Sequence, residues 1–386
     1  MSLVYLTKSN QIHGLARAQY EALPEMHRAA KNLYYVIYPK FFQLEGMRMR
    51  VLVIGGTGMI GHQLVPQLLQ QGHTVTVLSR GNRRPCYLRD VHHVVCDRHR
   101  LTTKDVPGTF DAVIDNVAYT PEDAQTVLQV LEGQIGQYVA ISTAFVYPGL
   151  PAVTMGTLEI MSEEWFSQHA TPTPHEVGLH AQYVQGKRAL ETYLVDFAQI
   201  RQDLGISIIR PGLQIMGPHT DDGRFAWFWL RVQDKGPIWI AAEHRWLLGP
   251  CQVSYSGDVA KVLIGAACVN QPGIRAYHAI QPELWSIEEY LLMMASILEV
   301  RLDIRYAPSS VLNKSLFADQ GTYRQPLPYR LALSTERTSR ELGMTWTPMI
   351  TWMKTTGQWV SEYYRTEIPA WYAHRNQELR FSYHDN

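Results

Sequence analysis

The chain has 386 residues, of which 46% are hydrophobic and 18% are charged, so it is long enough for two domains or for one large domain with a lobe. Basic and acidic residues balance at 35 each without a block of like charges, which argues against nucleic acid as a partner. The four cysteines form no C-x-x-C pair, which predicts neither a metal site nor a disulfide framework. No apolar run approaches the roughly 20 residues that span a bilayer, and the N-terminus lacks a signal-peptide pattern. These features predict a cytoplasmic protein without a membrane partner.

Residues 1–48 precede the first predicted strand and admit two interpretations. The part from Glu21 to Gln43 is rich in aromatic residues and would pack as a helix on the following domain. Alternatively, the start codon is assigned too far upstream, because Met47 and Met49 lie directly before that strand.

A strand, a glycine-rich turn, a helix and a second strand follow in close succession. The apolar run Arg50–Ile54 is typical of a strand buried on both faces, and Thr74–Leu78 is the second strand. The turn between the first strand and the helix has glycines spaced G-x-x-G-x-x-G. Such a turn lets the backbone approach a diphosphate, which then binds to the N–H groups at the helix N-terminus. The residues expected to contact a dinucleotide here are Gly55, Thr57, Gly58, Met59, Ile60 and Gly61.

The loop after the second strand favours NADP over NAD. An NAD enzyme usually has an acidic residue at this point to accept hydrogen bonds from the ribose. This chain has Ser79, Arg80 and Arg83 instead, and a hydroxyl with guanidinium groups suits a 2′-phosphate. The alternative is a solvated basic loop. Further along, Asp97 ends a predicted third strand at 91–95 and would touch the adenine, while Asn116 and Ala118 follow a fourth strand at 111–115 beside the expected nicotinamide ribose.

Hydroxyl groups and a Tyr–Lys pair come next along the chain. Ser142 and Thr143 end a predicted fifth strand, Gln137–Ile141, and face the crevice at the carboxyl edge of a parallel sheet. After a long loop at 149–175, a helical pattern at about 176–203 contains Tyr183 and Lys187. Residues four apart share a helix face, so the ammonium group is placed to lower the pKa of the phenol.

These residues resemble the extended short-chain dehydrogenase/reductase family, the group of nucleotide-sugar epimerases and related reductases, over most of the chain from Met49 to about Val360. The resemblance implies a doubly wound parallel α/β sheet (a Rossmann fold) at 49–215, continued at about 252–280. A smaller C-terminal α/β lobe at 216–251 and 281–386 would bind the substrate. It also implies that Thr143 binds the substrate oxygen, that Tyr183 exchanges the proton, and that Lys187 holds the nicotinamide ribose. Cofactor contacts are further implied for Ser142, Tyr183, Lys187, Arg210 and Pro211, and a homodimer is implied through the helix that carries the Tyr–Lys pair.

Departures from the family pattern narrow the expected chemistry. Dehydratase members carry an Asp–Glu pair where this chain has Ala144 and Phe145, so we expect no 4,6-dehydratase activity. The aromatic run at 221–229 either stacks on a substrate or forms a helix whose rings make the core of the lobe. The sequence thus predicts an NADP-dependent reductase or epimerase, with NAD as the alternative cofactor and a small molecule, such as a nucleotide sugar, as substrate. The alternative function is a non-catalytic nucleotide-binding scaffold or an RNA-binding relative.

Overall fold

The computed structural model describes residues 48–147, 159–161, 181–212, 214–220, 223–242, 252–269, 271–316, 331–366, 369, 372 and 374–383. The two interpretations of the N-terminal segment therefore lie outside the described residues, as does most of the loop predicted at 149–175.

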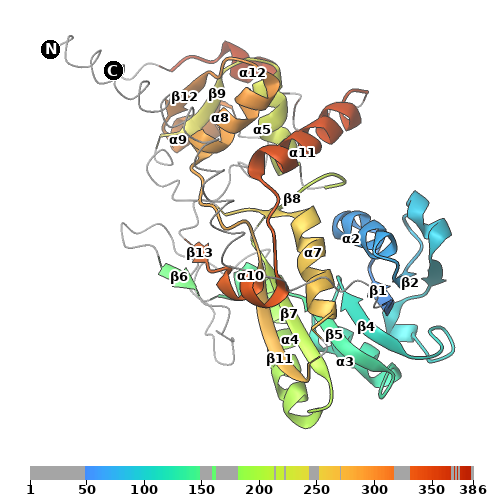
Figure 1. Cartoon of the computed structure of the whole chain (residues 1–386). Helices are drawn as coiled ribbons and strands as arrows, with labels where there is room; N and C mark the ends of the chain where they lie inside the picture. The colour runs from blue at the N-terminus through green and yellow to red at the C-terminus, as the bar shows by residue number, and fades with distance from the viewer. Residues whose placement is uncertain are drawn as a thin grey trace, which may run out of the picture. The chain divides into compact units, whose positions relative to one another are not determined.

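Seven parallel strands form the central sheet, in the order β11-β7-β5-β4-β1-β2-β3 (Figure 1). The order reverses between β1 and β4, and the crevice at such a reversal is where open α/β sheets bind ligands. This sheet confirms the predicted doubly wound α/β fold. The strands are β1 Arg50–Ile54, β2 Thr74–Ser79, β3 His92–Val95, β4 Phe110–Asp115, β5 Ile135–Ile141, β7 Gly205–Pro211 and β11 Gly273–Ala279.

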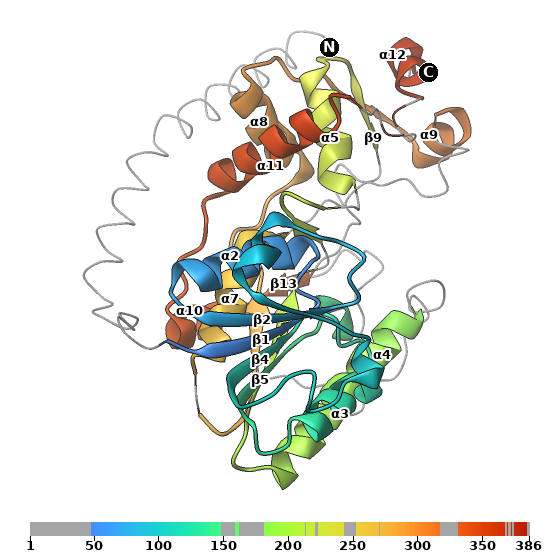
Figure 2. The same cartoon turned by 90° about the vertical axis from the view of Figure 1, so that its right-hand side faces the viewer.

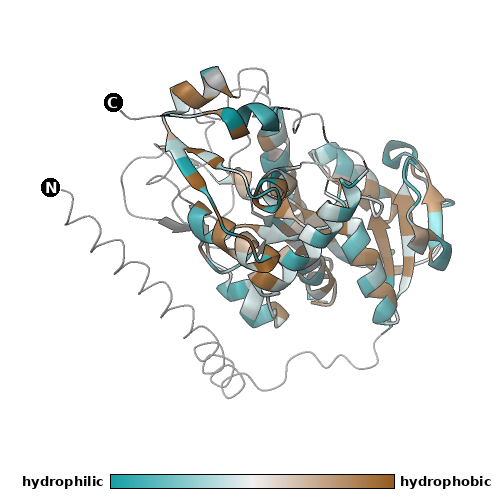
Figure 3. Cartoon of the chain, turned by 90° about the horizontal axis from the view of Figure 1, so that it is seen from above, coloured by the Kyte–Doolittle hydropathy of each residue, from teal (hydrophilic) through white to brown (hydrophobic). Residues whose placement is uncertain are grey.

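Helices cover both faces of this sheet (Figure 2). Helices α2 (Met59–Gln70), α7 (Ser256–Ala267) and α10 (Glu336–Leu342) share one apolar core with the sheet, and α3 (Pro121–Val130) and α4 (Ala181–Ile200) share the core on the other face. Because both faces of the sheet are covered, its strands are rich in apolar residues, and Figure 3 shows the sheet mostly in brown.

Local sequence signals set the ends of two helices near the crevice. At the end of α2, Gly72 takes a φ of 80°, and the backbone N–H groups of Gly72 and His73 donate to Leu69 and Leu68, which is a Schellman cap. At the start of α3, Thr120 and Asp123 form a reciprocal capping box with Pro121 in the first turn.

A second core lies in the C-terminal lobe. Helices α5 (Arg224–Gln233), α8 (Ile287–Leu298) and α11 (Met349–Tyr363) pack around it, and β9 (Ile238–Ala241) pairs in parallel with β12 (Ile304–Ala307). The remaining elements are β8 Ile215–Met216 paired with β10 Ser254–Tyr255, β6 Glu159–Met161 paired with β13 Leu331–Leu333, and helix α9 Ser309–Ser315.

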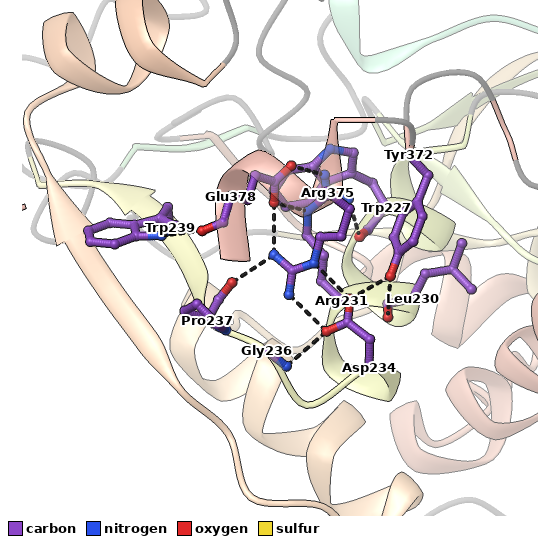
Figure 4. Close-up of polar contacts among 10 residues, drawn as sticks. All are labelled: Trp227, Leu230, Arg231, Asp234, Gly236, Pro237, Trp239, Tyr372, Arg375 and Glu378. Atoms are coloured by element: carbon purple, nitrogen blue, oxygen red, sulfur yellow. Dashed lines mark hydrogen bonds and ion pairs between the residues drawn. The ribbon is translucent and has the colours of Figure 1, made fainter. Parts of the chain in front are cut away.

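Ion pairs fasten the last helix, α12 (Arg375–Arg380), to the lobe (Figure 4). Glu378 accepts a hydrogen bond of 2.8 Å from Nε of Arg231 on α5, and a second contact joins Glu378 to the other end of that guanidinium. Arg375 donates to both oxygens of Asp234 at 2.7 and 2.8 Å, and Tyr372 donates to Asp234 at 2.5 Å. Two buried or half-buried cations thus face two carboxylates, so charge is balanced within the cluster.

Candidate nucleotide-binding and catalytic site

The glycine turn lies between β1 and α2 at the reversal of strand order. Gly55 has a φ of 75°, and a Cβ on Gly61 would lie 2.1 Å from the carbonyl oxygen of Gly56, so neither position accepts another residue without movement. Gly58 precedes α2, whose first turn has no acidic residue and no side-chain cap; a Cβ on Gly58 would meet no atom within 4 Å. The helix N–H groups and the open space beside Gly58 therefore fit an anionic diphosphate. Thr57, Met59 and Ile60 are half-buried around this space.

Two side chains that the sequence analysis did not predict hold the carbonyl groups of this turn. The Tyr87 hydroxyl donates to the Gly56 oxygen at 2.7 Å, and Nδ1 of His62 donates to the Gly58 oxygen at 2.9 Å. The two rings meet edge to face with their centroids 5.5 Å apart. His62 also stacks on His219, at 4.1 Å between centroids, and His219 in turn contacts Trp359 of α11. A column of rings thus joins the glycine turn to the C-terminal lobe.

At the predicted adenosine end of the dinucleotide site, the arginines after β2 are exposed, whereas the hydroxyl of Ser79 has hydrogen-bond partners within the protein. Arg80 and Arg83 are exposed. The Ser79 hydroxyl lies 2.8 Å from Nε2 of His93 and accepts from the backbone of Gly81 at 3.2 Å. The Asp97 carboxylate caps the short 3₁₀ turn after β3 by accepting from His99 at 3.0 Å. The hydroxyl of Ser79 thus contacts His93 of β3 and the backbone of the loop.

At the carboxyl end of β4, the side chain of Asn116 indicates a ligand site. Both amide atoms of Asn116 are buried, and within the described part of the chain neither has a hydrogen-bond partner. A buried amide without partners is unfavourable unless a ligand or ordered water completes its hydrogen bonds. The oxygen of Ala118, two residues on, accepts a hydrogen bond of 2.7 Å from Lys187.

The predicted catalytic residues come together where β5 meets α4. The Thr143 hydroxyl lies near enough to lower the pKa of the Tyr183 phenol, and Lys187 lies with its Nζ 5.8 Å from the centroid of the Tyr183 ring. The rings of Tyr119 and Phe145 flank Tyr183, with centroids at 6.1 and 6.5 Å. Thr143, Tyr183 and Lys187, which are separated by up to 44 positions, thus form one constellation.

The pKa values of this constellation differ from the sequence-based expectation. Burial raises the pKa of Tyr183, and the hydrogen bond from Thr143 only partly opposes this effect. Burial lowers the pKa of Lys187 to about 8, against the attraction of Asp115 and Glu191. For Tyr183, desolvation therefore outweighs the lowering of the pKa by the Thr143 hydroxyl.

Two residues predicted as cofactor contacts, Ser142 and Arg210, hydrogen-bond to a buried carboxylate. The Ser142 hydroxyl donates to Glu191 at 2.6 Å, and the guanidinium of Arg210, which is fully buried, donates to both oxygens of Glu191 at 2.9 and 2.7 Å. Their side chains therefore face the interior of the protein and not the crevice. Pro211 is buried at the end of β7, where it pairs with Ala279 of β11.

The aromatic run before β9 belongs to the core. Phe225, Trp227 and Trp229 lie on α5 and are at most 2% exposed. The alternative in which these three rings stack on a substrate is therefore wrong, and the core interpretation is confirmed.

Among the described residues, no helix is long and apolar enough to cross a membrane.

The strand order is that of the extended short-chain dehydrogenase/reductase fold. The NAD dependent epimerase/dehydratase family matches residues 51–246, and the chain belongs to that family. It is similar to the photosystem II assembly factor Ycf39 of Synechocystis sp. (strain PCC 6803), at 37% identity over 270 residues that make up 68% of this chain and 72% of that protein.

Solved structures of epimerases share the fold. A UDP-glucuronic acid 4-epimerase from Bacillus cereus in complex with NAD has a TM-score of 0.60 at 15% identity and covers 82% of this chain and 100% of its own. A UDP-glucose 4-epimerase from Thermus thermophilus in complex with NAD has a TM-score of 0.56 at 21% identity, covering 83% of this chain and 100% of its own. The family predicted from the sequence is thus confirmed, together with its architecture.

Proposed function

We propose that this chain is an NADP(H)-dependent oxidoreductase or epimerase that transfers hydride between nicotinamide and a carbonyl or hydroxyl group of a small-molecule substrate, with nucleotide sugars as the first class to test. The observation that carries the proposal is the contact of Tyr183 with Thr143 beside the buried Lys187. Nothing in a purely structural packing of helix on strand requires a phenol, a hydroxyl and an ammonium group at the edge of the nucleotide crevice.

The dinucleotide would be held by the turn at Gly55, Gly58 and Gly61, by the unpartnered amide of Asn116, and by Lys187. A bound nicotinamide supplies the hydride acceptor or donor. Two of the three N–H groups of Lys187 donate to the oxygens of Ala118 and Ile141, both at 2.7 Å, which leaves one for a ribose hydroxyl. The diphosphate and ribose contacts of the family thus have matching groups in this chain.

The protein's own proton chemistry lies with Tyr183. Because burial raises its pKa, the phenol is protonated at neutral pH and is ready to donate to a carbonyl oxygen. Thr143 would hydrogen-bond the same oxygen and hold it against the phenol. This arrangement favours the reductive direction.

NADP is proposed over NAD because of the exposed arginines Arg80 and Arg83 and the absence of an acidic residue between positions 79 and 84. The solved epimerases named above contain NAD, so NAD is the competing cofactor. A cytoplasmic homodimer formed through α4 is proposed on the family resemblance, and light scattering of the purified protein tests the dimer.

A second candidate function rests on the similarity to an assembly factor. In that case the chain binds a dinucleotide but acts on a protein complex and not on a small molecule.

Turnover by the Tyr183→Phe variant separates the two candidates. Tyr193→Phe is the matched control, because it removes a hydroxyl from the same helix. NADPH oxidation is measured against a panel of aldehydes, ketones and 4-keto nucleotide sugars. We expect Tyr183→Phe to lose roughly 10²- to 10⁴-fold in rate while the control retains the wild-type rate. Wild-type turnover that survives in Tyr183→Phe would refute the role of the tyrosine, and a wild type that binds NADPH without turning over any substrate would favour the assembly candidate.

A further inference from the structure

Three residues on one face of α4 meet three consecutive residues at the end of β5. Tyr183 lies beside Thr143, whose hydroxyl lowers the pKa of the phenol. Lys187 donates to the oxygen of Ile141, and Glu191 accepts from the hydroxyl of Ser142. The α4 residues are spaced four apart, so they lie one above the other on the helix. Of these three contacts, the one between Glu191 and Ser142 involves no predicted catalytic residue.

Glu191 is 1% exposed and needs a partner to remain charged. Arg210 of β7 supplies it through the two-point contact described above. Although burial by itself lowers the pKa of Arg210, the Glu191 carboxylate raises it above its ordinary value, so the guanidinium is ionised. The ion pair therefore holds the carboxylate in one orientation, toward Ser142.

The pair is held in turn by a chain of hydrogen bonds whose direction is determined. Nδ1 of His278 lies 2.5 Å from the oxygen of Ser334, which only accepts, so Nδ1 carries the proton. Nε2 of His278 then accepts from the hydroxyl of Tyr147, and the Tyr147 oxygen accepts from Arg210 at 2.9 Å. Burial lowers the pKa of His278 to about 3, in agreement with a neutral ring. In this series of hydrogen bonds, each of the donors named above has an acceptor.

We propose that Glu191 is a positioning residue for the proton-transfer site. By accepting the hydrogen bond of the Ser142 hydroxyl, Glu191 fixes the position of the adjacent Thr143 beside Tyr183. Arg210, Tyr147 and His278 in turn keep Glu191 in place. The proposal rests on the proposed function of Tyr183 and Thr143. A positioning role differs from that of a purely structural ion pair because it affects Tyr183. None of the hydrogen bonds above joins Glu191 to Tyr183 directly.

Ser142→Ala tests the proposal with little disturbance, because it removes one hydroxyl and leaves the Glu191–Arg210 pair intact. Ser207→Ala is the matched control: Ser207 is also buried in the central sheet, and it accepts a hydrogen bond of 2.9 Å from Gln137. The readout is the ¹⁹F NMR signal of Tyr183 in protein labelled with 3-fluorotyrosine, assigned by its loss in Tyr183→Phe. Urea denaturation of each variant verifies that it is folded.

We expect Ser142→Ala to shift the Tyr183 signal and its titration, while Ser207→Ala leaves both at wild-type values. Glu191→Gln, where it folds, is expected to shift the signal in the same direction. A Tyr183 signal unchanged in Ser142→Ala, or moved equally by Ser207→Ala, would overturn the proposal. Because the readout needs no substrate, this outcome is separate from a failure of the proposed function, which is tested by the turnover of Tyr183→Phe.

Discussion

Some side chains in this protein have pKa values that depend on burial more than on their neighbours. Lys187 and Tyr183 illustrate this at the candidate site, since each has its neutral form favoured by desolvation. The spacing of the two residues predicts their shared helix face correctly, but it contains no information about how much water reaches them. The direction of a pKa shift therefore had to come from the structure.

His278 allows a test of this effect through stability. Its pKa is about 3 in the fold and 6.5 ordinarily, so between these pH values the unfolded chain binds a proton that the folded chain does not. Stability should therefore fall as the pH is lowered through this window, with His278 contributing up to about 1.4 kcal/mol per pH unit. Urea unfolding of the wild type and of His278→Asn between pH 4.5 and 7 measures the slope.

The variant is expected to be less stable at pH 7 and to depend less on pH than the wild type. His92→Asn serves as the control, because His92 is exposed on β3 and should leave the wild-type slope unchanged. Equal slopes for wild type and His278→Asn would contradict the assignment of a neutral buried ring.

At the scale of elements, local signals predict helices and strands well and predict their contacts poorly. The second strand was expected to end at Leu78 and ends at Ser79, and the helix expected at about 176–203 spans Ala181–Ile200. In contrast, the Ser142–Glu191 hydrogen bond joins residues 49 positions apart, and the Tyr147–His278 bond joins residues 131 apart. No spacing rule connects such positions, because their proximity arises only when the sheet assembles.

Helix α12 gives a prediction at this scale. Glu378→Gln keeps the shape of the side chain but leaves the fully buried guanidinium of Arg231 without its counter-charge. We expect a loss of about 3–5 kcal/mol in the free energy of unfolding. Urea denaturation measures it.

Glu336→Gln is the control for this loss, because it breaks the exposed Arg340–Glu336 pair, at 3.5 Å, in α10. It should cost about 0.5 kcal/mol or less. Losses of similar size in the two variants would show that the ion cluster of α12 does not hold the lobe together.

For the molecule as a whole, the sheet domain and a lobe with its own core are joined by the ring column that runs from the glycine turn through His62 and His219 to Trp359. The glycine spacing was sufficient to predict the tight turn between β1 and α2, since such a turn depends on backbone geometry. The aromatic run on α5 was not sufficient to choose between core and substrate contact, because buried and ligand-facing tryptophans have the same sequence pattern.

The most direct test of the account is a fluorescence titration of the purified protein with NADPH and, separately, with NADH. The account predicts saturable binding of both, tighter for NADPH, and loss of the NADPH preference in an Arg80→Ala, Arg83→Ala double variant. Tighter binding of NADH by the wild type would contradict the role of the two arginines. Failure to bind either cofactor would contradict the central claim that the glycine turn, Asn116 and Lys187 form a nicotinamide dinucleotide site.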